Sequence, residues 1–399
     1  MSEQPFTAPT NRVAIVIVLI AANVLGFVAV DFPFSAIFEL KDLYDIKFQT
    51  ATLVLTYFTY GGALSLLIVG VLGDLYDRRW TIIGASFFLL LSSAWCANAT
   101  TLDEMLLGRF AQGLSAGGLT AVVTPMLIPL FSQHQSTRAL SLFGGANRLA
   151  PIFVAPPIYW IAETFNYNGF FWATALLCLP MLAAALFYLP KENIDIPRKG
   201  VLPIVGGFFS LLLHRRFMGY ALSQALALSS IGLLFYAPHF MGKHLMIGTV
   251  RTWYFTIIGL GILLLTANVT GILSKRFSRD QLIGIGARMQ VAGVATYLLY
   301  ILLAPTLMWQ GLLLTLAPYW IGLGLRVGAG LIQAVQVVPG AETRASALLI
   351  LFITGFTWLS ISSIQFGDKQ GLGPTTFILF FMTLASWGML RFIRPSPTP

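Results

Sequence analysis

The chain has 399 residues, of which 57% are hydrophobic and only 10% are charged. A soluble protein of this size does not need so much apolar surface, so the composition excludes a soluble globular protein and indicates a chain that crosses a membrane many times. The net charge of +9 comes from basic residues scattered through short polar segments. This scatter favours a membrane-topology signal over nucleic-acid binding.

Twelve apolar runs are each long enough to span a bilayer, which takes about 20 residues. In chain order the predicted spans cover residues 12–37, 49–71, 80–99, 102–131, 138–161, 168–189, 217–240, 250–274, 281–303, 307–335, 344–364 and 373–393. Residues 201–213, before span 7, are apolar and are expected to lie along the membrane surface. We predict an all-α membrane protein with six-helix bundles at residues 1–190 and 217–399 and a cytoplasmic linker at residues 191–216.

The lysines and arginines predict the orientation of the chain. Fifteen of them fall in the loops and tails on one side of the predicted spans and five in the loops on the other side. Because basic residues favour the cytoplasmic side, both termini are expected in the cytoplasm, with the chain a multi-pass protein of the inner membrane. The first apolar run has no cleavage site, so we expect a retained span rather than a signal peptide.

A polar link between spans 2 and 3 reads Gly70-Val-Leu-Gly-Asp-Leu-Tyr-Asp-Arg-Arg-Trp80. It closely resembles the loop between helices 2 and 3 of the major facilitator superfamily of transporters. A carboxylate beside a helix end can pair with arginine or with exposed helix N–H groups. The resemblance implies a conformational latch on the cytoplasmic side, formed by Gly70, Asp74, Arg78 and Arg79. The alternative is an ordinary basic cytoplasmic loop.

Two motifs recur in both halves of the chain. Gly70-Val-Leu followed by Arg78 is matched by Gly271-Ile-Leu followed by Arg279. Thr137-Arg-Ala, which opens span 5, is matched by Thr343-Arg-Ala, which opens span 11. Two six-span repeats are the arrangement of the superfamily, and they place the substrate site between the halves near the midplane of the membrane.

One acid and four arginines lie within the predicted spans: Asp31, Arg109, Arg148, Arg288 and Arg326. A charge at the bilayer centre costs about 2.5–3.5 kcal/mol on insertion scales, so each is expected to face a cavity or a partner. Asp31 is a candidate proton site, or else a residue at the outer water boundary. Arg109 lies at a similar depth and is expected to pair with Asp31, for coupling or for structure alone. Arg288 can snorkel to the cytoplasmic surface.

The arginines in spans 5 and 10, Arg148 and Arg326, have no intramembrane acid left to neutralise them. If both face the central cavity, they favour an anionic substrate, because arginine pairs bidentately with carboxylate or phosphate. Alternatively they bond backbone carbonyls or lie outside the cavity. Gln112, Asn147 and Tyr57 are expected to complete the substrate site, since they neighbour the charged positions in sequence or on the expected helix face.

Three segments resemble the bicyclomycin-resistance (Bcr/CflA) type of drug:proton antiporters, whose relatives include siderophore exporters. They are Asp31 with Pro33, the motif Arg109-x-x-Gln112-Gly113, and Leu149-Ala-Pro-Ile-Phe-Val-Ala-Pro-Pro157. The resemblance implies that Asp31 and Arg109 serve proton coupling. It also implies helix bends that seal the interface during antiport, at Pro151, Pro156 and Pro157. That branch does not usually have arginine at positions 148 and 326, which favours an anionic cargo over lipophilic cations.

The sequence therefore predicts a proton-coupled alternating-access transporter that exports, by antiport, an anionic or polycarboxylate small molecule such as a siderophore. The alternatives are a symporter that takes up an anionic metabolite and a proton-driven multidrug exporter of cationic or neutral drugs. An enzyme is not expected, since the four histidines lie in or near loops without a repeated spacing. No cofactor, metal or nucleic acid is expected. The expected partners are the substrate, protons and lipid, with the chain a monomer.

Overall fold

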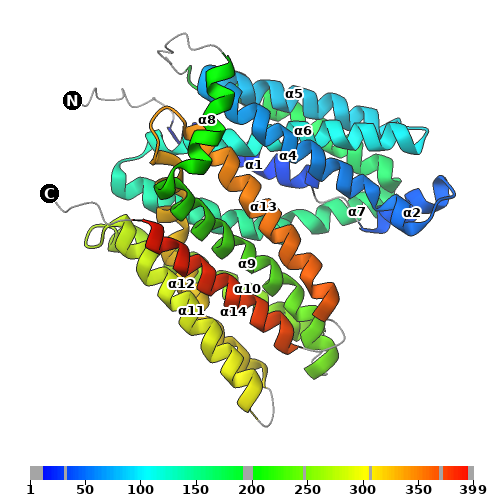
Figure 1. The fold of residues 1–399 in the computed structure, drawn as a ribbon. Coiled ribbons are helices and arrows are strands. Elements are labelled where there is room, and N and C mark those ends of the chain that lie inside the picture. Colours follow the sequence, from blue (N-terminus) through cyan, green and yellow to red (C-terminus); the bar gives the residue numbers. More distant parts are fainter. Residues whose placement is uncertain are drawn as a thin grey trace. The chain divides into compact units, whose positions relative to one another are not determined.

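The computed structural model describes residues 12–30, 34–191, 201–245, 249–304, 308–367 and 372–393. Within this part the chain forms fourteen α-helices and two short 3-10 helices (Figure 1). Ten helical segments there are long and apolar enough to cross a membrane, and Ile257–Leu273 is a shorter apolar helix. The prediction of an all-helical multi-pass protein is confirmed. The predicted spans at residues 138–161 and 250–274 are not among the ten.

The chain divides into two compact units. Unit 1 comprises residues 1–130, 149–205 and 340–347, and unit 2 comprises residues 131–148, 206–339 and 348–399. Each unit therefore includes a short segment from the opposite half of the sequence. Those segments belong to α7 (Gln133–Tyr188) and α13 (Glu342–Gly367), which each contribute residues to both units.

Helix α6 lies at the centre of the contacts in unit 1, where it packs against α1, α4 and α5. In chain order, unit 1 begins with α1 (Arg12–Val30), α2 (Phe34–Leu43), α3 (Phe48–Ala51), α4 (Leu53–Leu75), α5 (Arg78–Ala97), α6 (Leu102–Leu127) and η1 (Ile128–Leu130). A Cβ atom at Gly61 of α4 would lie 2.0 Å from the carbonyl oxygen of Phe110, and one at Gly113 of α6 would lie 2.0 Å from that of Phe58. Only glycine permits such a close approach of two helix backbones.

Unit 2 has a comparable seam between α11 and α12. Its helices are α9 (Arg215–Leu245), α10 (Thr249–Leu273), α11 (Arg279–Leu303), α12 (Trp309–Gln336) and α14 (Leu372–Met389), followed by η2 (Leu390–Phe392). A Cβ atom at Gly286 would lie 2.4 Å from the carbonyl oxygen of Gly322, and the reverse distance is also 2.4 Å. Helix α8 (Val201–Leu213) is helical but short, and its position along the membrane surface stays a prediction.

Local sequence explains where several helices begin. Thr101 and Glu104 form a capping box at the start of α6, and Ser278 and Gln281 form one at the start of α11. The Asp77 carboxylate accepts a hydrogen bond from the backbone N–H of Arg79 at the start of α5. Such caps satisfy N–H groups that have no partner inside the helix.

The predicted span over residues 12–37 corresponds to α1 and the beginning of α2, but residues 31–33 lie outside the described part of the chain, so a single span there stays a prediction. Asp31 and Pro33 lie outside the described residues. Predicted spans 5 and 6 both fall within α7, where Phe165 and Asn166 break the helical backbone. Asn166 has a φ of 59° and a ψ of −173°, a combination that residues other than glycine rarely adopt.

Helix α7 continues through Pro151, Pro156 and Pro157 without non-helical backbone angles; those angles occur at Phe165 and Asn166. A bend at the three prolines therefore stays a prediction.

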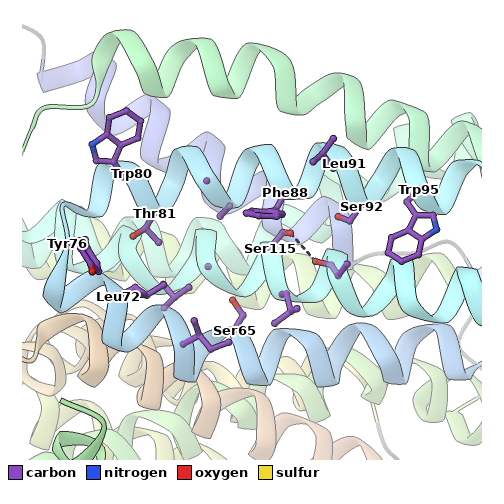
Figure 2. A pocket seen from close by; sticks show the side chains of 17 residues that line it. Ser65, Leu72, Tyr76, Trp80, Thr81, Phe88, Leu91, Ser92, Trp95 and Ser115 are labelled. Carbon is purple, nitrogen blue, oxygen red and sulfur yellow. Dashed lines mark hydrogen bonds between the residues drawn. The ribbon is translucent and has the colours of Figure 1, made fainter. Parts of the chain in front are cut away.

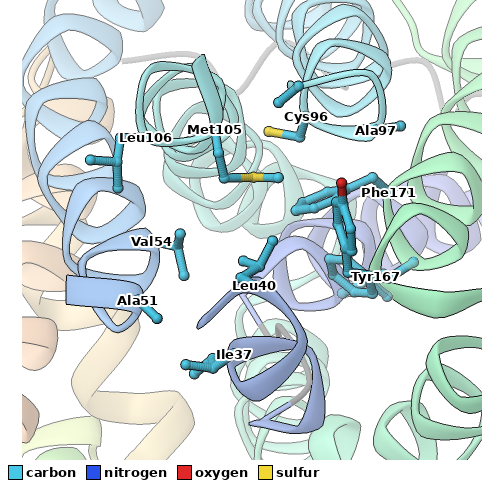
Figure 3. Close-up of a cluster of buried hydrophobic side chains, with 13 residues drawn as sticks. Ile37, Leu40, Ala51, Val54, Cys96, Ala97, Met105, Leu106, Tyr167 and Phe171 are labelled. Carbon is cyan, nitrogen blue, oxygen red and sulfur yellow. The ribbon is translucent and has the colours of Figure 1, made fainter. Parts of the chain in front are cut away.

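A cluster of thirteen buried hydrophobic side chains lies in unit 1 (Figure 3). Leu40 of α2, Val54 of α4, Met105 of α6 and Phe171 of α7 gather in this cluster together with Cys96 of α5. In a membrane such side chains hold helices together chiefly through van der Waals packing. The cluster therefore holds α2 and the second half of α7 over the region of α6 that carries Arg109.

Candidate functional site

Arg109 of α6 is fully buried and makes directional contacts with two other helices. Its Nη1 atom donates to the carbonyl oxygen of Ala29 on α1 at 3.0 Å, and its Nε atom donates to that of Val54 on α4 at 3.3 Å. Nη1 also donates to Oε1 of Gln112, one turn along α6, at 2.8 Å. The structure thus brings together Arg109 and Gln112, two of the predicted site residues.

Aromatic rings and a second amide bond complete the surroundings of this guanidinium. The Arg109 Cζ atom lies 4.4 Å from the ring centroid of Phe58 and 5.9 Å from that of Phe171, distances at which a cation is attracted to the ring face. Gln112 Nε2 donates to Oγ of Ser93 on α5 at 2.7 Å. The network therefore links α1, α4, α5, α6 and α7.

The remaining predicted residues around this network are only partly described. Asp31 lies outside the described residues, so its pairing with Arg109 stays a prediction. Tyr57 packs against the buried cluster of Figure 3, and its ring centroid lies 6.3 Å from that of Tyr60. Asn147 and Arg148 lie in α7, and their side chains lie outside the description.

Arg326 of α12 is also fully buried, and it ties together four helices of unit 2. Its Nη1 atom donates to Oε1 of Gln290 on α11 at 2.9 Å and to Oγ of Ser386 on α14 at 2.8 Å. Its Nη2 atom donates to Oγ of Ser223 on α9 at 2.6 Å. Ser223 and Ser386 each donate their own hydroxyl proton to the carbonyl oxygen of the other. Their lone pairs are therefore directed at the guanidinium.

These hydrogen bonds describe the surroundings of Arg326, and its place in the substrate site stays a prediction. The hydrogen bonds described for it go to uncharged groups of its own unit, as expected for an arginine that stabilises the packing of helices. Gln290, Ser223 and Ser386 were not identified from the sequence. Their signal is indirect: a mid-span arginine without an acid requires neutral acceptors on neighbouring helices.

Asp74 near the end of α4 contacts the first turn of α13 inside unit 1. Its Oδ1 atom accepts from the backbone N–H of Thr343 at 2.8 Å, and its Oδ2 atom accepts from Nε of Arg344 at 2.7 Å. Arg78 donates through Nε to Oγ1 of Thr343 at 3.0 Å and lies 3.6 Å from the Glu342 carboxylate. One carboxylate therefore pairs with an arginine and caps a helix, the two contacts that the sequence motif offers.

The other two predicted latch residues have different surroundings. Arg79 donates through Nη2 to the carbonyl oxygen of Leu186 on α7, so its described contact is away from α13. Gly70 is buried in α4. A side chain at the nearby Gly73 would collide with Thr343, since its Cβ atom would lie 2.5 Å from the threonine methyl group.

Unit 2 contains a related contact in which two arginines donate hydrogen bonds to neutral groups. Arg138 donates through Nη2 to Oδ1 of Asn268 on α10 at 3.0 Å, and a Cβ atom at Gly271 would lie 2.7 Å from the Arg138 Cβ atom. Arg279 donates through Nη2 to Oγ of Ser136 at 3.4 Å. In each unit, the motif that follows the second span of one half thus contacts the Thr-Arg-Ala motif of the other half. The acceptor of the arginine is the Asp74 carboxylate in unit 1 and the Asn268 amide in unit 2.

An apolar groove of about 680 Å³ lies on unit 1 between α4, α5 and α6 (Figure 2). Trp80 and Trp95 of α5 lie near its opposite ends, and Phe88 lies between them. No Asp, Glu, Lys or Arg is among its lining residues. Ser65 of α4 is buried at this groove, and its hydroxyl has no hydrogen-bond partner among the described residues. Sequence reasoning missed this groove, because its lining residues read as ordinary span residues.

The family model of the Major Facilitator Superfamily matches residues 16–363. The chain belongs to this superfamily. Its membership confirms the resemblance carried by the polar link at residues 70–80.

Solved structures of superfamily members share its fold. The FucP transporter, crystallised in the outward conformation, has a TM-score of 0.75 and 14% identity, with 97% of this chain and 100% of that chain covered. The proton:xylose symporter XylE has a TM-score of 0.70 and 18% identity, with 97% of each chain covered. At these identities the likeness concerns the fold alone.

Curated relatives match a shorter part of this superfamily member. Multidrug resistance protein MdtL of Shigella flexneri serotype 5b is 27% identical over 173 residues, which is 41% of this chain and 44% of that protein. MdtL of Escherichia coli strain K12 is 26% identical over 189 residues, which is 47% of this chain and 48% of that protein. The matched part spans less than half the length of these relatives.

Proposed function

We propose that this transporter exports neutral, lipophilic drug-like compounds in exchange for protons. The observation that carries this choice is the enclosure of Arg326, whose described hydrogen bonds all go to uncharged groups of its own unit. An anionic cargo would need a guanidinium available to it. The drug-export alternative is therefore favoured over export of a polycarboxylate or siderophore. The names of the MdtL relatives support the same choice.

The apolar groove on unit 1 supports a lipophilic cargo as well. Its volume of about 680 Å³ falls within the range of roughly 300–1,000 Å³ typical of pockets for drug-sized ligands. We propose that a lipophilic compound occupies it on the way from the bilayer to the transport pathway. The rings of Trp80, Phe88 and Trp95 supply apolar contact to such a compound.

Arg109 and Gln112, together with Asp31, form the proposed proton-coupling group. Arg109 is held by carbonyl groups of α1 and α4, so a change of charge at Asp31 would alter the balance of bonds among the helices that meet at Arg109. Asp74, Arg78 and Arg344 form the proposed latch that makes and breaks during alternating access. In this proposal the chain works as a monomer in the inner membrane, with both termini in the cytoplasm.

Inverted membrane vesicles that contain the full chain test the cargo. With an acidic lumen, we expect accumulation of a neutral lipophilic drug that stops when a protonophore collapses the gradient. Citrate-like polycarboxylates and iron-chelating siderophores should show no such accumulation. Gradient-dependent accumulation of a polycarboxylate without any drug transport would contradict the proposal and restore the anionic cargo.

Substitution at Gly84 tests the groove separately. Gly84 lines the groove, and a Cβ atom there would meet nothing within 4 Å. Gly84→Leu should fill the space and slow transport of bulky lipophilic drugs without loss of folded protein. Gly261→Leu in α10 is the matched control, because a Cβ atom there also has open space but lies outside the groove. Equal drug transport by the two variants would show that the groove is not part of the transport pathway.

A further inference from the structure

A second pocket, separate from the groove on unit 1, lies between α11 and the end of α14 in unit 2. Its volume is about 330 Å³, and it is lined by Gly284, Arg288, Trp387, Leu390 and Arg391. Gly284 leaves room there, since a Cβ atom on this glycine would meet nothing within 4 Å. Two arginines thus border one small hollow.

Arg288 is a charged residue on an exposed, mostly apolar face of α11. It is exposed, and along the same face the exposed residues that follow one or two turns apart include Ala292, Leu299 and Leu303. Arg279–Leu303 is one of the candidate membrane spans. A cation on a face directed to lipid is unfavourable unless it reaches the interface or meets an anion. The proposed function assigns no role to Arg288.

The side chain of Arg288 is directed toward the predicted cytoplasmic end of α11. Its Nε atom donates to the carbonyl oxygen of Gly284, one turn back along the helix, at 3.3 Å. This direction agrees with the tilt of helical side chains toward the N-terminus and with snorkelling of arginine in membranes. It carries the guanidinium into the pocket, at whose other side Arg391 follows α14.

The two guanidiniums meet no carboxylate in the described part of unit 2. Arg288 and Arg391 take part in none of the ion pairs found among the described residues. The nearest acid along α11, Asp280, accepts hydrogen bonds from Tyr220 and Gln333 instead. Arg391 lies over the ring of Trp387, with 5.8 Å between its Cζ atom and the ring centroid. The pocket therefore carries two positive charges and an aromatic ring of the type enriched at membrane interfaces.

We propose that Arg288 and Arg391 bind the phosphodiester headgroup of an anionic phospholipid in the cytoplasmic leaflet. Guanidiniums bind phosphate oxygens bidentately, and basic pockets between spans on the cytoplasmic side suit lipid headgroups. The acyl chains of the same lipid then lie along the exposed face of α11 that runs from Ala292 to Leu299. A soluble phosphate offers the same chemistry to the two arginines, but it has no acyl chains to contact the exposed face of α11.

Native mass spectrometry of the delipidated full chain tests this site. The probes are phosphatidylglycerol and phosphatidylcholine with identical acyl chains, and the variants are Arg288→Gln, Arg391→Gln and their double variant. We expect the parent to prefer phosphatidylglycerol over phosphatidylcholine. In the double variant the ratio of the two affinities should fall about tenfold, which corresponds to the loss of one hydrogen bond to a charged group. Arg215→Gln, which removes an exposed arginine of unit 2 outside the pocket, should keep it.

Three outcomes would overturn the proposal. The double variant could keep the full preference, or Arg215→Gln could lose as much as the double variant, which would indicate general attraction between charges. Inorganic phosphate could displace phosphatidylglycerol completely at equal concentration, which would assign the pocket to a soluble anion. Arg288→Lys and Arg391→Lys keep the charge, and we expect them to retain part of the preference. They provide the test if the glutamine variants fail to fold.

Discussion

Asp74 and Arg344 lie 270 positions apart in the chain and form an ion pair with 2.7 Å between Oδ2 and Nε. The carboxylate side chain is 3% exposed and also accepts the N–H groups of Thr343 and Arg344. The pair is therefore shielded from water, unlike a typical surface salt bridge, and its removal leaves a buried charge without its partner.

A double-mutant cycle measures this pair. Asp74→Asn should lower the free energy of unfolding by about 1.5–3 kcal/mol, the range for hydrogen bonds to charged groups. With Arg344→Gln, the coupling energy should exceed about 0.5 kcal/mol, as for residues in direct contact. Thermal unfolding in detergent gives both values. The exposed pair of Lys41 and Asp42 is the control, and its cycle should show no measurable coupling. Additive effects at Asp74 and Arg344 would contradict the contact.

Arg109→Gln should abolish accumulation driven by a proton gradient while drug exchange without a gradient continues. The reason is that glutamine cannot hold the acceptors on α1 and α4 together with Gln112. Arg109→Lys should not restore accumulation, because a lysine ammonium is a point charge without the planar fork. Comparison of counterflow with gradient-driven transport in vesicles checks both variants. Arg276→Gln, which removes an exposed arginine, should leave both activities intact. Gradient-driven accumulation by Arg109→Gln would exclude Arg109 from coupling.

Arg326→Gln should destabilise unit 2 and reduce transport of all cargoes by the same factor. Ser223, Ser386 and Gln290 would lose the donor they now share, and each hydrogen bond to a charged group contributes about 1.5–3 kcal/mol. Thermal unfolding and transport of two drugs with different shapes provide the measurements. An unchanged unfolding temperature with loss of only one cargo would instead place Arg326 in the substrate site.

Glu39→Gln should change how stability depends on pH. The Glu39 carboxylate accepts from the backbone N–H of Tyr167 at 2.9 Å, but burial raises the pKa of Glu39 above its usual value, and this effect exceeds the lowering by the N–H group. The folded state then favours the protonated form. The parent protein should lose stability relative to Glu39→Gln as pH rises from about 4.3, the value for an unfolded glutamate.

Unfolding temperatures of parent and variant between pH 4 and pH 8 check this dependence. The two should coincide near pH 4 and differ by a constant amount, with the variant the more stable, once Glu39 is fully ionised. A difference that grows as the pH falls would have the wrong sign.

Length, hydrophobic runs and capping residues determined much of this protein from the sequence alone. The helical class, most span positions and the polar link at residues 70–80 follow from patterns that act over a few residues. The close neighbours Arg109 and Gln112 could be paired in the same way, because they lie one turn apart on α6. The resemblance carried by the motif around Asp74 gave the superfamily.

Tertiary structure decided which of these residues meet. Gly61 and Gly113 set the separation of α4 and α6, and so where the carbonyl groups that hold Arg109 lie. Residues 340–347 belong to unit 1, although they come late in the chain, and so Arg344 lies beside Asp74. The acceptors of Arg326 come from three other helices. A sequence pattern records the period of one helix, whereas the rotation and depth of its neighbours depend on packing along the whole chain.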